Sequence, residues 1–154
     1  GSQKVDASSL PPVAVKSVPE ELRRKLLLFD WWIQNEDRIL GEMGGNVNLL
    51  WSPEGRLLTV IDHNNAFDAG FDEAAFFEGH VFRAERDSVP EPYLLEQSQA
   101  FAKAAARFAE LTGDLPDEWV ERHGSTGDFK PESAIEILGR SAKLLDVFVV
   151  KGHE

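Results

Sequence analysis

Residues 46–62, NVNLLWSPEGRLLTVID, contain two short apolar runs separated by a turn sequence. The runs are residues 49–51 and 57–61, and the connection is SPEG at residues 52–55. Short apolar runs bounded by Pro and Gly are typical of strands, and so short a connection favours an antiparallel β-hairpin. Because a hairpin brings its two ends together, the polar residues that flank it are expected to lie close to each other.

Helical patterns occupy most of the remaining sequence. Pro19, Glu20 and Glu21 suit the first turn of a helix. Its apolar positions repeat at helical spacing up to Ile33, and its end is expected at the glycines that begin with Gly41. Further helices are predicted at residues 72–82, 93–111, 116–122 and 131 to about 150. The predicted fold class is therefore α+β, mainly α with one small β-hairpin.

The composition indicates a folded protein and excludes several classes of function. The 154-residue chain has a formal net charge of −11, which opposes binding to a phosphate backbone, so no direct nucleic-acid partner is expected. It contains no Cys, which excludes disulfides and thiolate chemistry. No stretch approaches the ~20 apolar residues of a membrane span, and no signal-peptide pattern opens the chain. The sequence thus predicts a cytoplasmic protein with no membrane partner.

Polar residues gather at the two ends of the predicted hairpin. Asn46 and Asn48 precede its first strand, and Asp62 follows the apolar run of its second. An acid at the end of a buried strand is expected to lose hydration and to need a partner or a metal. Carboxylate and amide oxygens suit a hard cation such as Mg²⁺, whereas zinc prefers nitrogen or sulfur. The sequence predicts a Mg²⁺ site made by these three side chains.

The order of these residues matches the second half of kinase chemistry. In protein kinases a catalytic-loop Asp accepts the substrate hydroxyl proton, a downstream Asn holds one Mg²⁺, and an Asp beyond it holds Mg²⁺ as well. The same order appears here as Asp37, Asn46 and Asp62. The segments that carry the pattern, FDWWIQNEDR at 29–38, GNVNLLW at 45–51 and VIDHN at 60–64, resemble those of HipA-like kinases.

The resemblance implies a role for each residue. Asp37 would be the catalytic base, Asn46 the metal-binding Asn, and Asp62 the counterpart of the Asp in the kinase Asp-Phe-Gly element. The spacer between Asp37 and Asn46 is longer than the four residues usual in these kinases, which leaves Asn46 and Asn48 as alternative metal ligands. The implied activity is phosphorylation of Ser or Thr in a protein substrate with ATP and Mg²⁺, and well-known members of the family are toxins of toxin–antitoxin systems.

The sequence has neither the glycine-rich phosphate-covering loop nor the strand lysine of a kinase N-lobe. Residues 1–18 predict an extended lead-in, and residues 19–154 a kinase-like C-terminal lobe without its N-lobe. The missing lobe would come from a longer chain or from a separate one, and this lobe alone would be incompetent. The alternatives are a non-catalytic binding or regulatory module and a metal-dependent phosphatase or nuclease, the nuclease being disfavoured by the charge of −11.

Each candidate residue also has a purely structural interpretation. Asp37 suits a solvated turn beside Arg38, and the two asparagines suit turns because Asn tolerates unusual backbone angles. A lone His beside a strand is more often a structural hydrogen-bonding group than a catalytic one, which applies to His63. His80 lies next to apolar residues and is interpreted as a packing residue.

Overall fold

The computed structural model describes residues 8–41, 45–116, 119 and 129–149. The chain forms two compact units, residues 1–88 and residues 89–154. The first unit carries the antiparallel hairpin and two α-helices, and the second is helical where it is described. The predicted fold class, mainly α with a small β-hairpin, is confirmed.

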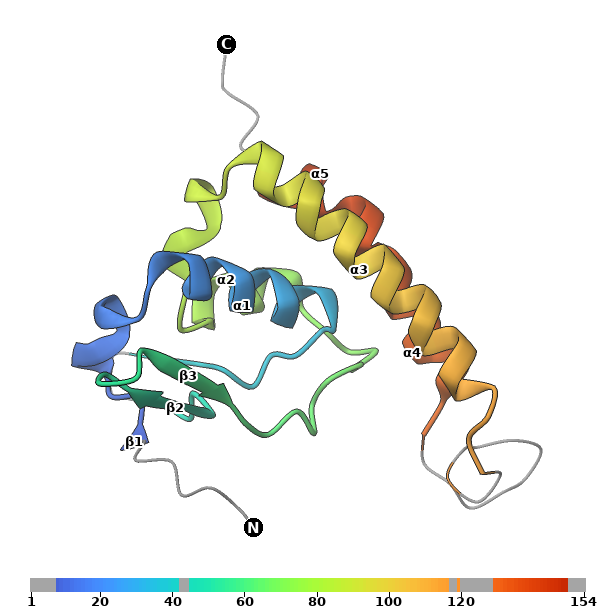
Figure 1. Ribbon diagram of the computed structural model, residues 1–154, viewed down its shortest axis with the longest axis horizontal. Helices are drawn as coiled ribbons and strands as arrows, with labels where there is room; N and C mark the ends of the chain where they lie inside the picture. Colours follow the sequence, from blue (N-terminus) through green and yellow to red (C-terminus); the bar gives the residue numbers. More distant parts are fainter. Residues whose placement is uncertain (1–7, 42–44, 117–118, 120–128, 150–154) are drawn as a thin grey trace. The chain divides into compact units, whose positions relative to one another are not determined.

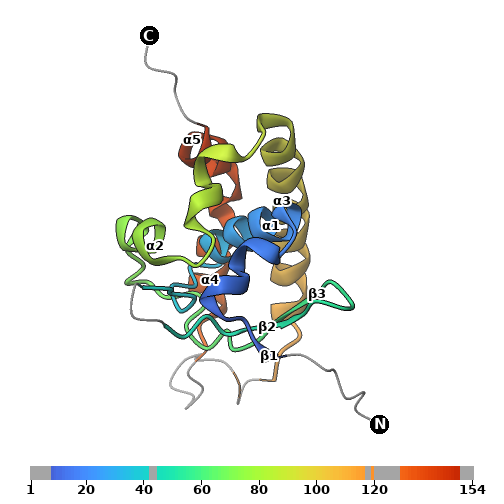
Figure 2. The same cartoon turned by 90° about the vertical axis from the view of Figure 1, so that its left-hand side faces the viewer.

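The first unit contains a three-stranded antiparallel sheet with strand order β1-β2-β3. The strands are β1 (Ser8–Ser9), β2 (Leu49–Ser52) and β3 (Leu57–Val60). The predicted hairpin is present, and in its register Leu49 pairs with Val60 and Ser52 with Leu57. The strand β1 was not predicted, because two serines carry no apolar pattern. Figures 1 and 2 show the hairpin with β1 along one edge.

Helix α1 (Glu20–Trp32) forms a layer separate from the sheet in both views (Figures 1 and 2). The predicted start is confirmed, but the predicted end near Gly41 is wrong, because the helix ends at Trp32 with Ile33 as its C-cap. Gln34 then adopts a left-handed φ of 55°, a conformation that is incompatible with continuing a right-handed α-helix. The core of this unit includes the fully buried Leu27, Leu28, Trp31 and Leu49.

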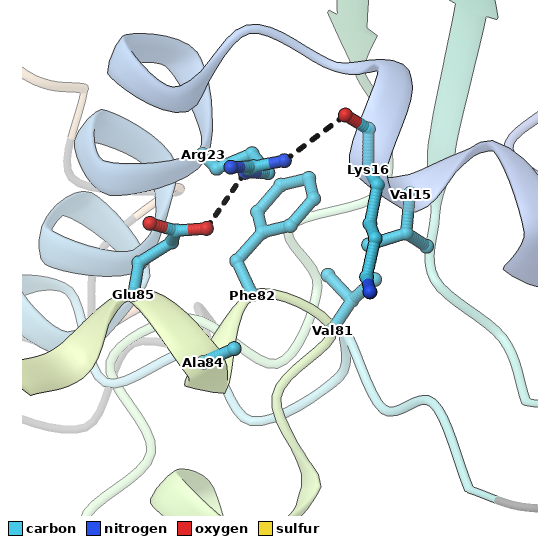
Figure 3. A pocket seen from close by; sticks show the side chains of 7 residues that line it. All are labelled: Val15, Lys16, Arg23, Val81, Phe82, Ala84 and Glu85. Carbon is cyan, nitrogen blue, oxygen red and sulfur yellow. Dashed lines mark hydrogen bonds and ion pairs between the residues drawn. The ribbon is translucent and has the colours of Figure 1, made fainter. Parts of the chain in front are cut away.

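The described part of the predicted lead-in is ordered structure. Besides β1 it contains the 3₁₀ helix η1 (Pro12–Ser17). Arg23 on α1 donates to the Lys16 carbonyl at 3.2 Å, and its Nε lies 2.8 Å from Glu85 Oε1 on the 3₁₀ helix η2 (Arg83–Ser88). Figure 3 shows this side chain at a small pocket of about 360 Å³ between the three elements, where Phe82 forms part of the lining. The Arg23 side chain thus connects η1 to α1 and α1 to η2 within the first unit.

Helix α2 (Glu73–Gly79) is the second α-helix of the first unit. Asp72 caps its N-terminus by accepting hydrogen bonds from the backbone N–H groups of Ala74 and Ala75, at 2.9 and 3.1 Å. Trp31 of α1 donates from Nε1 to Glu73 Oε2 at 2.8 Å, which joins the two helices. The helix ends at Gly79, three residues before the predicted end, and His80 is its C-cap.

The second unit packs one long helix against three short ones (Figure 1). Helix α3 (Glu91–Thr112) contacts α4 (Pro131–Leu138), the 3₁₀ helix η4 (Gly139–Lys143) and α5 (Leu144–Phe148). The predicted helix from 131 to about 150 is thus divided into three pieces. The predicted helix at 116–122 lies almost entirely outside the described residues. Within the described helices, none combines the length and the apolar character that a membrane crossing requires.

Candidate functional site

The loop that follows α1 carries the predicted catalytic Asp37. This side chain is half-buried, and its Oδ2 accepts a hydrogen bond from Asn48 Nδ2 at 2.7 Å. Its backbone N–H also approaches Asn35 Oδ1 at 3.4 Å. Both Asn partners act on Asp37 at once, one through the side chain and one through the backbone, so the carboxylate has a defined orientation. The structure therefore joins Asp37 to the residues that precede the hairpin.

Asn48, and not Asn46, is the asparagine that reaches Asp37. Asn48 is only 8% exposed and has a φ of 49°, a left-handed conformation that Asn adopts more readily than most residues. Asn46 is exposed. Because an ionised carboxylate only accepts hydrogen bonds, the NH₂ group of Asn48 faces Asp37 and its carbonyl Oδ1 remains to accept a cation.

Asp62 follows the second strand of the hairpin, and the preceding Ile61 pairs with Asn48. The backbone N–H of Ile61 donates to the Asn48 carbonyl at 3.1 Å, which extends the strand pairing past the end of β3. Arg38 Nη1 donates to the carbonyls of both residues, at 2.9 Å to Asn48 and 3.0 Å to Ile61. The next residue, Asp62, has a left-handed φ of 55°. The hairpin thus places the segments of Asn48 and Asp62 side by side, as the sequence predicts.

The burial expected of Asp62 is wrong. Its side chain is exposed, and β3 is not a buried strand, since Leu57 is 48% exposed and none of its four residues is buried. In the described sheet β3 is an edge strand, with β2 as its neighbour on one side. The carboxylate is consequently hydrated and accessible to a ligand from solvent.

A buried polar cluster underlies the site and was missed by sequence reasoning. Asp30, Asn35, Arg38 and His80 are each at most 2% exposed. Asp30 Oδ2 lies 2.8 Å from Arg38 Nε and 3.1 Å from His80 Nε2, and Asp30 Oδ1 accepts from Asn35 Nδ2 at 3.1 Å. The available signal was an acid at position 30 within the most apolar stretch of α1, between Phe29 and Trp31.

The interpretation of His80 as a pure packing residue is therefore incomplete. It does contact aromatic rings, with Phe76 at a centroid distance of 4.9 Å, but it also bonds Asp30. His63 is exposed, and its ring meets Phe29 edge-on at 6.1 Å. Asn64 and Asn65 are exposed as well.

The side chains at the site suit a shared rather than a self-sufficient metal site. In the described part of the chain, no three His, Asp or Glu side chains gather closely enough to hold a metal ion by themselves. One carboxylate, from Asp62, and one amide oxygen, from Asn48, are nevertheless compatible with Mg²⁺ when nucleotide phosphates and water supply its other ligands. The donor set fits a cation that arrives with a phosphate ligand.

The family model of the HipA-like kinases matches residues 1–144 of the sequence. The chain belongs to the HipA-like kinase family. Comparison with curated proteins and with solved structures found no match. The match covers the first unit and the second as far as residue 144, whereas the resemblance recognised in the sequence covers about residues 19–82. Family membership assigns this HipA-like kinase chain to phosphotransferases that use ATP.

Proposed function

We propose that this HipA-like kinase chain supplies the catalytic base and the metal ligands for transfer of the ATP γ-phosphoryl group to a Ser or Thr hydroxyl of a protein substrate. The observation that carries the proposal is the Asn48–Asp37 hydrogen bond at 2.7 Å, made beside the segment that leads into Asp62. Asn48 thereby connects Asp37, on the loop after α1, to the end of the hairpin that leads into Asp62.

Asp37 would accept the proton of the substrate hydroxyl. Its carboxylate is only half-buried, so a substrate can reach it, and one oxygen is held by Asn48. A fixed carboxylate within hydrogen-bond reach of the hydroxyl is the geometric requirement for a general base. Phosphoryl transfer needs mainly such positioning, together with stabilisation of charge.

Asn48 through Oδ1 and Asp62 through its carboxylate would hold Mg²⁺ on the nucleotide phosphates. The ion neutralises negative charge that develops on the transferred group. Charge neutralisation matters especially here, because the chain itself carries −11 and would repel a free nucleotide. Nucleotide binding is therefore expected to depend on Mg²⁺. A nucleotide-covering N-lobe, on the same or a separate polypeptide, completes the proposed enzyme.

Titration calorimetry of a non-hydrolysable ATP analogue into the protein, with and without Mg²⁺, tests this proposal. Asp62→Asn is expected to weaken Mg²⁺-dependent binding at least about tenfold, because a neutral amide replaces an anionic ligand. In the complete enzyme, joined to its N-lobe, Asp37→Asn should retain nucleotide binding but lower phosphoryl transfer by about 10²–10⁴-fold, the usual contribution of a general base.

Asp87→Asn is the matched control, since it makes the same chemical change at an exposed acid of η2. Equal nucleotide affinity in the wild type and Asp62→Asn would remove the metal assignment. Normal transfer by Asp37→Asn would remove the base assignment, whereas no transfer by the wild type joined to an N-lobe would favour a non-catalytic binding module.

A further inference from the structure

We propose that Arg38 is a positioning residue whose guanidinium holds the three segments of the phosphoryl-transfer site in register, and that Asp30 and His80 fix it in place. The catalytic consequence rests on the function proposed above, whereas the positioning itself is a statement about geometry. Arg38 has no direct part in the proposed chemistry, since its side chain is 0% exposed and out of reach of a substrate.

One guanidinium contacts all the segments that carry site residues. Its Nε lies on Asp30 of α1 at 2.8 Å, and its Nη1 donates to the carbonyls of Asn48 and Ile61 at 2.9 and 3.0 Å. Arg38 directly follows Asp37, and Ile61 directly precedes Asp62. The two carbonyl contacts are therefore made at Asn48, itself a site residue, and at Ile61, one residue before Asp62.

Asp30 connects the same guanidinium to a second support of Asp37. Its Oδ2 accepts from Arg38, and its Oδ1 accepts from Asn35 Nδ2 at 3.1 Å. Asn35 Oδ1 in turn faces the backbone N–H of Asp37 at 3.4 Å. A single buried carboxylate thus restrains the catalytic loop on both sides of Asp37.

His80, the C-cap residue of α2, contacts Asp30. The backbone N–H of Phe82 donates to His80 Nδ1 at 3.1 Å, so Nε2 is the ring nitrogen that carries the proton towards Asp30 Oδ2. The main chain is held here too, because Val81 N–H donates to the Arg38 carbonyl at 2.8 Å.

The energetics favour a positioning role over a purely stabilising one. Taking two charges out of water is costly, and apolar residues of similar volume often replace a buried ion pair without loss of stability. In the described part of the protein, Arg38 Nη2 is buried without a hydrogen-bond partner, which is a further cost. An apolar pair would fill the space, but it would donate nothing to the carbonyls of Asn48 and Ile61.

The test compares backbone amide exchange by NMR in the full chain for the wild type, the double variant Asp30→Leu/Arg38→Met, and Arg38→Lys. The double variant removes both charges together and leaves no unpaired buried charge, so its urea midpoint is expected to fall less than that of Arg38→Met alone. The Ile61 amide, which bonds the Asn48 carbonyl, should nevertheless lose protection at least about tenfold, while the β2–β3 ladder stays protected.

Arg38→Lys separates charge from geometry. It keeps a cation opposite Asp30, but one ammonium group lacks the rigid fork that reaches three acceptors at once. It should loosen the Ile61 amide as the double variant does. Should the double variant fail to fold, Arg38→Lys decides alone. Arg107→Lys is the matched control, because that arginine is exposed and lies in the second unit.

Wild-type protection of the Ile61 amide in a folded double variant, or its restoration by Arg38→Lys, would overturn the proposal. An equal fall at every amide of the first unit would also overturn it, because that is what simple destabilisation produces. Exchange is measured without turnover, so a failure of the proposed function, seen as normal transfer by Asp37→Asn, is a separate result.

Discussion

Asn48 forms hydrogen bonds with Asp37, Ile61 and Arg38. Its NH₂ group bonds Asp37, its backbone carbonyl accepts from Ile61 and Arg38, and its side-chain Oδ1 remains for a cation. The left-handed φ of 49° lets the side chain turn towards the catalytic loop while the backbone enters β2. A residue with a branched side chain would be strained in this conformation.

Asn48→Ala is expected to weaken Mg²⁺-dependent binding of the ATP analogue by about 10–100-fold, because it removes both the proposed ligand and the partner that orients Asp37. Asn46→Ala removes the same group from an exposed position and is expected to cost less. Calorimetry on the two variants side by side measures the difference. Equal losses, or a larger loss in Asn46→Ala, would contradict the choice of Asn48.

The sequence specified the types of the candidate residues but not how deeply their side chains are buried. Asp37 and Asp62 stand out because acids flank apolar segments in the order of a kinase site. The sequence alone suggested a dehydrated Asp62, and the structure has it exposed. Asp30 went unnoticed because one acid within a helix is usually solvated, and only packing shows that its position faces the interior.

At the scale of elements, the end of α1 determines the shape of the site. The sequence has no strong helix breaker between Gln34 and Gly41, so local propensity allows the helix to continue. The helix stops at Trp32, and the backbone N–H of Asn35 bonds the Asp30 carbonyl at 2.9 Å as the chain turns away. Leaving the helix here gives Asn35 and Arg38 their buried contacts with Asp30, so tertiary hydrogen bonds outweigh propensity.

The hairpin turn offers a test of backbone strain. Arg56 has a left-handed φ of 47°, which costs a non-glycine residue about 1–2 kcal/mol. Arg56→Gly removes this cost but adds freedom to the unfolded chain, so we expect a net gain of about 0.5–1 kcal/mol in the free energy of unfolding. Urea titration followed by Trp fluorescence measures it in the first unit, where Trp31, Trp32 and Trp51 lie.

Gly55 provides the matched comparison. Its φ lies outside the left-handed region, and an added Cβ would meet no heavy atom closer than 3.8 Å. Gly55→Ala should therefore stabilise by about 0.4–1 kcal/mol through the unfolded state alone. A destabilised Arg56→Gly together with a stabilised Gly55→Ala would show that the arginine side chain contributes more than its strain costs.

At the scale of the whole molecule, the chain forms two compact units with separate cores. Leu144 is fully buried in the second unit, and Leu144→Ala should cost about 2–5 kcal/mol by leaving a cavity. The buried tryptophans belong to the first unit, and Trp119 is 63% exposed. If each unit unfolds independently, this variant lowers the urea midpoint of far-UV circular dichroism and leaves the fluorescence midpoint unchanged.

Leu27→Ala is the reciprocal variant, since Leu27 is fully buried in the first unit. It should lower the fluorescence midpoint at once, because it opens a cavity next to α1. Coincident shifts of both probes in both variants would indicate that the two units unfold as one cooperative body.

The sequence by itself determined the hairpin, the mainly helical character of the rest, and the residue types of a kinase site, because each is encoded in short-range periodicity, turn chemistry and residue order. It also carried the family resemblance, which the family match confirms. Only the tertiary structure decided that Asn48 meets Asp37, and that Asp30 meets both Arg38 and His80, the latter 50 positions away. Such contacts depend on how elements distant in sequence pack together and on which polar groups need partners once water is excluded, and no local pattern records that.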